Sequence, residues 1–358
     1  MENGTKHQKE FFQKVKLIDL LKQKRLWYPK IYASILVFSL ALFLRIWRLS
    51  SAPGIYVDEP IYVEIAANLP IQGGIYLSGI PWFVHPPLFF ILQSQFFQAL
   101  GINAVSFSNI LAARIPTCII SSLTVLIVFL WISKISNIMI GGLASLLLML
   151  EQYSLNFGRV GIMESTVIFF IVASLYSLWS AVQTHDLKRY ILGGVLFGLA
   201  LLTKELAIYV LIILLFWVIL SRYAKIKLNI EGIVTFAFIG LVIYVIYFDY
   251  QLYVYGVNFL MAKITSLENL FSTYFIGSNS IQSSTYNTLV YDITRTVSIY
   301  FVSLVLMVIG VCTSFYIILR KKSYSALFLV SWFLGSAVFR LLIGIENVKF
   351  FFHSVTIF

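Results

Sequence analysis

Cysteine and charged residues are both scarce in this chain of 358 residues. Its two cysteines are too few for a disulfide framework or a zinc ribbon, and both Cys118 and Cys312 fall inside apolar runs. Charged residues make up 11% of the chain, whereas hydrophobic residues make up 60%. A water-bounded core cannot absorb so much apolar surface, so the composition predicts a polytopic membrane protein of the all-α class.

Apolar runs long enough, or nearly long enough, to cross a bilayer recur along the sequence. They predict a helical bundle of about nine or ten spans, with candidates at 31–49, 108–133, 138–152, 162–182, 190–203, 206–221, 230–250, 296–319 and 324–344. The last residues, "ENVKFFFHSVTIF", resemble the start of a further span that stops short. We therefore expect the sequence to be truncated at its C-terminal end.

Basic residues gather in the segments that these spans place on one side. If the N-terminus is cytoplasmic, the inner segments hold 17 of the 26 Lys and Arg residues, at 1–30, 133–137, 183–189, 222–229 and 320–323. This agrees with the positive-inside rule. We divide the chain into a basic cytoplasmic segment, 1–30, and one transmembrane domain, 31–358, with long outer loops at 50–107 and 251–295.

The same topology places ten of the 15 acidic residues outside or near the outer face: Asp58, Glu59, Glu64, Glu151, Glu164, Glu205, Asp249, Glu268, Asp292 and Glu346. The net charge of +11 then reflects orientation and contact with membrane lipids of the cytoplasmic leaflet. No nucleic-acid partner is expected, because the sequence offers no basic, aromatic soluble domain.

Residues 54–90 interrupt the apolar pattern directly after the first span. They hold three carboxylates, one histidine, four glycines and five prolines. The "DEP" at 58–60 predicts a helix that begins with Asp58 and Glu59 at its positive end and is ended by Pro70 and Gly73-Gly74. The stretch 85–101, "HPPLFFILQSQFFQALG", predicts a helix along the interface with its glutamines toward water. The first outer loop is thus expected to be a structured platform that presents two adjacent carboxylates.

Four more charged residues fall near the outer ends of predicted spans: Arg114, Arg159, Glu164 and Lys204. Ionisable groups at membrane depth are costly and are functional candidates by default. One alternative is a structural ion-pair network, for example Glu164 with Arg114. The other is a site at the outer leaflet, since carboxylates can take a proton from a hydroxyl while Lys and Arg hold a phosphate.

An ordered set of motifs carries a resemblance to a known group of enzymes. The set comprises "DE" after the first span, "HPPL" at 85–88, "AARIP" at 112–116, Arg159 followed five residues later by Glu164, and "TK" at 203–204. Over roughly residues 30–220 it resembles the GT-C glycosyltransferases of the protein O-mannosyltransferase and lipid A aminoarabinose transferase kind, glycosyltransferase family 39 and its relatives. The family often has Asp where this chain has Glu164, and many members continue well past the length of this chain.

The resemblance implies a membrane enzyme that takes a sugar from a polyprenyl- or dolichyl-phosphate carrier. The acceptor would be a protein, lipid or glycan on the extracytoplasmic face of the cell membrane. Asp58 is then the candidate general base, and Glu59 is a second catalytic candidate. Candidates for the donor phosphate are Lys204, Arg114 and His85.

Arg159 and Glu164 are expected to support this site. His85 could equally be a polar cap before two prolines. The resemblance suggests inversion at the anomeric carbon, and a retaining mechanism with Glu59 as nucleophile stays open.

No cofactor is predicted with certainty. A divalent metal stays open but is not indicated, since His7 and His185 lack any partner pattern. Three other functions compete: a lipid-linked glycan polymerase or ligase, a transporter, and a noncatalytic membrane scaffold. A transporter would place its charged residues near the midplane, whereas here they cluster at the outer end. A scaffold would tolerate loss of Asp58.

Overall fold

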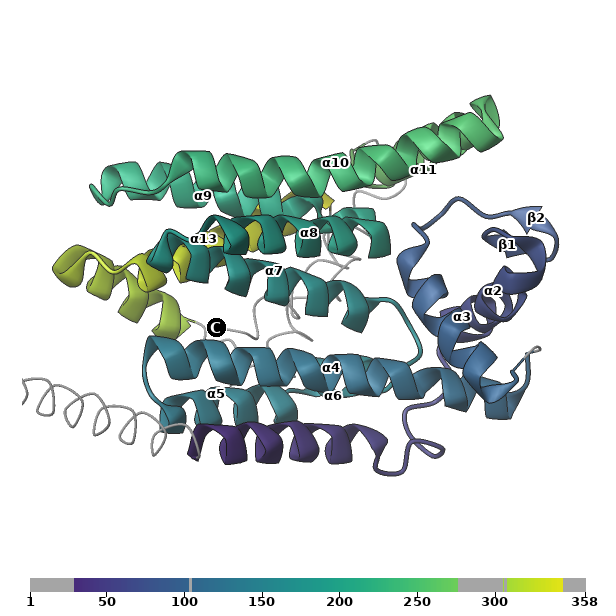
Figure 1. Ribbon diagram of the computed structural model, residues 1–358, viewed down its shortest axis with the longest axis horizontal. Helices are drawn as coiled ribbons and strands as arrows, with labels where there is room; N and C mark the ends of the chain where they lie inside the picture. The colour runs from purple at the N-terminus through teal and green to yellow at the C-terminus, as the bar shows by residue number, and fades with distance from the viewer. Residues whose placement is uncertain (1–28, 103–104, 276–304, 306–307, 344–358) are drawn as a thin grey trace, which may run out of the picture.

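In the computed structural model, long helices run side by side in a bundle, and a small platform lies beyond one of its ends (Figure 1). The structure describes residues 29–102, 105–275, 305 and 308–343. The predicted N-terminal basic segment up to residue 28, residues 296–304 and 306–307 of the predicted span 296–319, and the C-terminal stretch 346–358 lie outside these residues.

The long elements follow the apolar runs of the sequence. In chain order they are Pro29–Ile46, α4 (Phe107–Ile135), α5 (Ile138–Leu150), α7 (Glu164–Thr184), α8 (Leu187–Thr203), α9 (Val210–Tyr223), α10 (Ile230–Tyr255), the helix 308–321 and α13 (Tyr324–Ile343). Two short helices connect them, α6 (Gln152–Phe157) and the 3₁₀ helix η1 (Glu205–Tyr209). The all-α membrane class is confirmed.

Five described segments are long and apolar enough to cross a membrane: Pro29–Ile46, Phe107–Ile135, Glu164–Thr184, Glu205–Tyr223 and Ile230–Tyr255. By contrast, α5 has 13 residues and α8 has 17. At 1.5 Å per residue these two are about 20 and 26 Å long, less than the roughly 30 Å of bilayer hydrocarbon. The count of nine or ten spans therefore stays a prediction.

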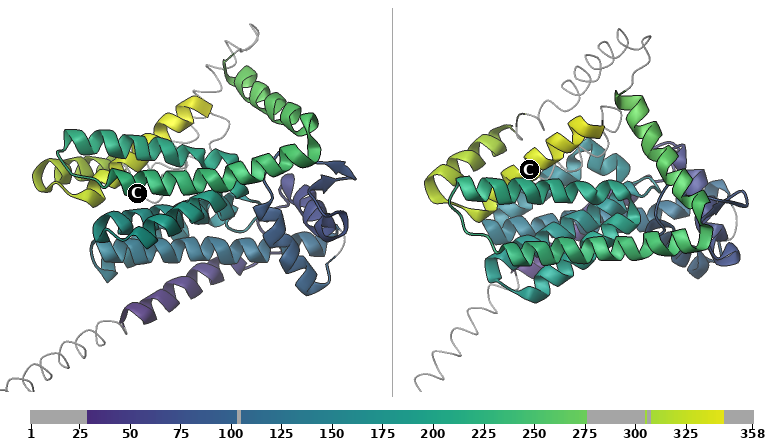
Figure 2. Two further views of the ribbon diagram at one scale, coloured as in Figure 1. Left: turned by 45° about the horizontal axis from the view of Figure 1, so that its top comes forward. Right: turned by 90° about the horizontal axis from the view of Figure 1, so that it is seen from above.

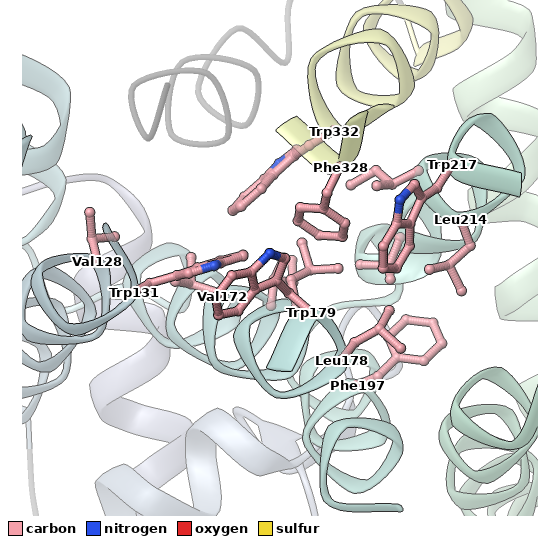
Figure 3. Close-up of a cluster of buried hydrophobic side chains, with 14 of the residues drawn as sticks. Val128, Trp131, Val172, Leu178, Trp179, Phe197, Leu214, Trp217, Phe328 and Trp332 are labelled. Atoms are coloured by element: carbon pink, nitrogen blue, oxygen red, sulfur yellow. The ribbon is translucent and has the colours of Figure 1, made fainter. Parts of the chain in front are cut away.

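An aromatic core joins helices that are far apart in the sequence. Figure 3 shows Phe328 and Trp332 of α13 pointing toward tryptophans of α4, α7 and α9. Trp332 stacks on Trp131 with 5.7 Å between ring centroids, and Phe328 meets the ring of Trp217 edge-on at 4.7 Å. Each such pair contributes on the order of 1 kcal/mol beyond burial of its area. This core fixes α13 against the rest of the bundle.

Close backbone contact holds α8 between α7 and α10. At Gly194, a β-carbon would lie 2.7 Å from the backbone oxygen of Phe236 on α10, too close for any larger residue. Gly198 makes a similar contact, since a β-carbon there would lie 2.8 Å from the side chain of Ile243 on α10. On its other side α10 exposes apolar residues such as Phe238 and Ile246, as expected of a helix that faces lipid.

The platform consists of α2 (Asp58–Gln72), the two-stranded antiparallel hairpin β1 (Tyr76–Leu77) and β2 (Ile80–Pro81), and α3 (Leu88–Leu100). As predicted, α2 begins at "DEP" and ends before Gly73-Gly74; Pro70 lies inside its last turn and does not end it. Buried apolar residues of α2 and α3 pack against each other and against α4. The platform is thereby fixed on the end of the bundle.

The prediction that the glutamines of α3 face water is only partly correct. Gln95 and Gln98 are exposed, as predicted, but Gln93 is 1% exposed and donates to the backbone oxygen of Ala113 at 3.3 Å. The prediction for Gln93 was wrong because this face of α3 packs on α4 and requires a polar group to satisfy that oxygen.

After α10 the chain turns sharply into α11 (Val257–Phe275), which leaves the end of the bundle at an angle (Figure 2). The turn is made at Gly256, whose φ of 58° and ψ of −138° are accessible only to glycine. Rings from this corner contact the platform: Phe83 lies 5.0 Å from Tyr255 and 5.5 Å from Phe259. The start of the predicted outer loop 251–295 is therefore a helix that packs beside the platform.

Candidate active site

Glu59 and Arg114 form a buried ion pair where the platform meets α4. Two parallel hydrogen bonds of 2.7 Å join the guanidinium of Arg114 to the carboxylate of Glu59. The side chain of Arg114 is 1% exposed and that of Glu59 is 0% exposed. The carboxylate also accepts from the backbone N–H groups of Tyr56 and Gly161, at 2.8 and 2.7 Å. Glu59 thus connects α2, α4 and the loop before α7.

The remaining N–H groups of Arg114 are used as well. They donate to the backbone oxygens of Leu49, Pro53 and Gly54 at 3.3, 2.9 and 2.9 Å. A guanidinium has five N–H groups, and all five of Arg114 now have partners within the protein. In this arrangement Arg114 has no N–H left for a phosphate, although it was expected to bind one. The pair is an ion pair of the structural kind considered above for Arg114, but its partner is Glu59 and not Glu164.

Arg159 holds the same loop from another side. Its guanidinium donates to the backbone oxygens of Trp47 and Ala52, the latter at 2.7 Å. These contacts fix the chain between the first helix and α2. They are consistent with the supporting role expected of Arg159.

Lys204 and Glu164 form a second ion pair. Their Nζ and Oε1 atoms lie 3.1 Å apart, and the side chains are 12% and 6% exposed. Glu164 is the first residue of α7, where the positive end of the helix favours a carboxylate. Its other oxygen, Oε2, is buried and has no hydrogen-bond partner among the residues that the structure describes. A ligand with a donor group could satisfy it.

Asp58 lies next to this pair and is differently placed from its neighbour Glu59. It is half-buried, and within the described part of the chain its carboxylate has no hydrogen-bond partner. Burial raises the pKa of Asp58 above its usual value, the nearby Glu164 carboxylate raises it further, and Lys204 opposes the rise. A carboxylate with a raised pKa and no fixed partner is able to accept a proton.

A third ion pair was not predicted from the sequence. Lys263 of α11 pairs with Glu205 of η1, and the hydroxyl of Tyr244 lies 3.5 Å from the same carboxylate. Lys263 is 13% exposed. The only sequence signal was a single lysine in the predicted outer loop 251–295.

His85 lies close to both lysines. Burial lowers the pKa of His85 well below its usual value, and the charges of Lys204 and Lys263 lower it further. The imidazole is therefore neutral at physiological pH and can offer a single N–H but no positive charge. Its ring packs edge-on against Trp82 at 5.4 Å and Tyr62 at 6.3 Å.

The structure therefore sorts the predicted residues into two groups. Glu59, Arg114 and Arg159 bind protein groups and hold the platform in place. Asp58, His85, Glu164 and Lys204, joined by Lys263, lie together at the end of the bundle. This second group combines a proton acceptor with two ammonium groups, which suits chemistry on a phosphate ester. Among the described residues no set of three or more His, Cys, Asp or Glu side chains gathers as a metal site would require.

Comparison with known proteins yields one family match and several structural neighbours. The sequence profile of the family described as dolichyl-phosphate-mannose-protein mannosyltransferase matches residues 84–248, slightly less than half of the chain. This range includes His85, Arg114, Arg159, Glu164 and Lys204 but not Asp58, Glu59 or Lys263. Among curated proteins no match was found.

Solved structures share the fold at low sequence identity. ArnT from Cupriavidus metallidurans, bound to undecaprenyl phosphate, gives a TM-score of 0.65 at 14% identity over 93% of this chain and 58% of its own. The oligosaccharyltransferase AglB from Archaeoglobus fulgidus, in complex with an inhibitory peptide and a dolichol-phosphate, gives 0.63 at 13% identity over 92% and 49%. The chain thus spans about half the length of these proteins. The resemblance drawn from the motifs is confirmed at the level of the fold.

Proposed function

We propose that this chain, which has the GT-C fold, transfers a sugar from a polyprenyl- or dolichyl-phosphate carrier to an acceptor on the extracytoplasmic face of the membrane. The proposal is supported by the mannosyltransferase profile over residues 84–248 and by two neighbours whose structures contain a polyprenyl or dolichol phosphate. The observation that carries it is that Asp58, whose carboxylate has no hydrogen-bond partner among the described residues, lies beside Lys204.

Asp58 acts as the general base in this proposal. The neighbouring carboxylate of Glu59 has both oxygens occupied by Arg114 and by backbone N–H groups, so it is poorly suited to take a proton. Among the described residues, Asp58 has no such partners. Glu164 is the second candidate base, since its Oε2 is unpartnered among the described residues. It is the weaker candidate because its Oε1 already accepts from Lys204.

Lys204 and Lys263 bind the carrier phosphate. In the donor this group is a diester with one negative charge, and the leaving lipid phosphate is a monoester that gains a second charge during the reaction. Two ammonium groups therefore interact more strongly with the transition state than with the donor, which is the condition for accelerating the reaction. In this structure each lysine is instead paired with a carboxylate, Lys204 with Glu164 and Lys263 with Glu205. Neutral His85 can add one hydrogen bond to a phosphate oxygen.

The reaction is a single displacement at the anomeric carbon. The acceptor hydroxyl gives its proton to Asp58 as its oxygen bonds to this carbon. The bond from the carbon to the phosphate oxygen breaks, and its electron pair remains on the lipid phosphate. A retaining mechanism needs a second, nucleophilic carboxylate, and Glu59 is held away from that role by Arg114. We therefore propose inversion.

The test uses the purified chain with a panel of polyprenyl- and dolichyl-phosphate sugars and membrane extracts as acceptors. Label that moves from one carrier to a protein, lipid or glycan, with release of free lipid phosphate, supports the proposal. Transport of an intact labelled carrier or sugar across a sealed vesicle, without release of lipid phosphate, contradicts it in favour of the transporter alternative.

A further inference from the structure

A second group of cations lies at the opposite end of the bundle from the candidate active site. On α4, Lys134 follows Arg114 by 20 residues, which corresponds to about 30 Å along the helix. Lys134 donates to the hydroxyl of Ser180 on α7 at 2.8 Å. Arg189, at the start of α8, donates through Nη1 to the same hydroxyl. Two cations from different helices thus converge on one neutral oxygen.

The charges around this point are mainly positive. Among the described residues, Lys134 experiences the charges of Arg189 and Lys30, both of which are cations. A carboxylate is present in Asp186, but it accepts from Nε of Arg189 at 3.2 Å and caps α8 through the N–H of Lys188. Lys134 therefore lies among like charges with a hydroxyl as its acceptor. Bringing two cations to one hydroxyl is unfavourable unless an anion joins them.

Aromatic rings flank the cations on the side of the membrane core. The ammonium of Lys134 lies 5.3 Å from the ring centre of Trp179 and 5.9 Å from that of Tyr176. Trp179 is buried in the aromatic core, so its ring holds Lys134 at the edge of that core. The cations are also accessible: the side chain of Arg189 is 42% exposed, and Lys134 is an exposed residue.

We propose that the ends of α4, α7 and α8 form a binding site for the phosphate head group of an anionic phospholipid, with Lys134, Arg189 and Ser180 as its ligands. The phosphate would lie between the two cations and accept from both. Ser180 is buried beneath them, and its hydroxyl, which only accepts from the two cations here, would donate its O–H to the phosphate. A lipid is favoured over a free phosphate because the site lies at the ends of membrane helices, where lipid head groups are concentrated. In the proposed orientation this is the cytoplasmic leaflet.

The test places the full chain in nanodiscs of phosphatidylcholine, with and without phosphatidylglycerol, and identifies retained lipids by native mass spectrometry. We expect wild type to retain phosphatidylglycerol selectively. Each cation near an anionic lipid contributes roughly fivefold to binding, so Lys134→Gln with Arg189→Gln should lower retention by about twenty-five-fold. The matched control is Arg222→Gln with Lys227→Gln, which removes the same charge from the same end of the bundle and should retain the lipid as wild type does.

Two further measurements keep the test decisive. Lys134→Arg with Arg189→Lys preserves both charges and should retain the lipid even if the glutamine variant does not fold. Inorganic phosphate added to phosphatidylcholine nanodiscs should not raise the thermal stability of wild type. The proposal is overturned if wild type shows no preference for phosphatidylglycerol, if the glutamine variant and the control behave alike, or if free phosphate reproduces the effect of the lipid.

Discussion

Replacing Glu59 with glutamine should strongly lower the free energy of unfolding, because Glu59 is assigned a structural role and not a role in proton transfer. The substitution keeps the shape of the side chain but removes its charge from a site where Arg114 is 1% exposed. It also replaces one acceptor oxygen by an NH₂ group, which cannot accept a hydrogen bond. At the position of Oε2 the NH₂ group would face Nη2 of Arg114 and the N–H of Tyr56. At the position of Oε1 it would face Nε of Arg114 and the N–H of Gly161. Leaving one partner of a buried pair unmatched typically costs about 3–5 kcal/mol.

Glu64→Gln is the matched control. Glu64 lies on the same helix, is only half-buried and accepts from the backbone N–H and hydroxyl of Ser78 at 2.7 and 3.1 Å. Without a buried cation opposite, its loss should cost about 1 kcal/mol. Thermal unfolding of both variants in identical nanodiscs measures the difference.

The assignment of Glu59 as a structural residue predicts a clear order. Glu59→Gln should unfold at a distinctly lower temperature than Glu64→Gln, and its remaining folded fraction should keep measurable transferase activity. Equal unfolding temperatures for the two variants, with activity abolished only in Glu59→Gln, would refute the reasoning and return Glu59 to a catalytic role.

Three other predictions follow from the same site. Lys263→Met should lower kcat/KM for the lipid donor by roughly ten- to a hundredfold, as expected for one charged hydrogen bond to phosphate, while Lys263→Arg should keep most of the wild-type kcat/KM. Unchanged donor kinetics in the methionine variant would exclude Lys263 from the phosphate site. The apparent pKa of the acidic limb of the pH–rate profile should lie above the ordinary pKa of an aspartate, because a raised pKa keeps Asp58 protonated, and inactive as a base, to higher pH. An apparent pKa at or below that of an ordinary aspartate would argue against Asp58 as the base. In a chain whose Cys118 and Cys312 are replaced by serine, Ile80→Cys on the exposed platform should react with an impermeant thiol reagent from outside intact cells, and reaction only after permeabilisation would reverse the proposed orientation.

Periodic apolar patterns predicted the bundle well because membrane helices must satisfy their backbone hydrogen bonds internally. Local signals also gave the platform: "DEP" begins α2, and Gly73-Gly74 follows its last residue. Span lengths were less predictable. Apolar residues continue across helix ends and turns, so the run 138–152 contains both α5 and the start of α6.

The division of work between Asp58 and Glu59 could not be read from their positions. Adjacent residues on a helix point in directions about 100° apart, so one carboxylate meets Arg114 and the other faces Lys204 and Glu164. Which one does so depends on how α2 is rotated against α4. That rotation is set by packing with α3 and by backbone groups of Gly54 and Gly161, which carry no charge pattern in the sequence.

Lys263 was missed for a related reason. Its place beside Glu205 depends on the turn at Gly256 and on the rings of Phe83, Tyr255 and Phe259, which hold the start of α11 beside the platform. Phe83 lies more than 170 positions before Tyr255 and Phe259 in the chain. In the sequence, the Phe and Tyr residues that make these contacts cannot be distinguished from the many other Phe and Tyr residues of the membrane helices.

The most direct test of the central claim is the rate of sugar transfer by Asp58→Asn. This change keeps the size of the side chain and removes the proton acceptor, and Asp58 has no ion-pair partner whose loss would disturb the fold within the described residues. We predict that transfer falls by at least about a hundredfold, as expected for a lost general base, while membrane insertion and unfolding temperature match wild type. Transfer at a near-normal rate by a correctly inserted Asp58→Asn protein would contradict the account and make Glu164 the next base to test.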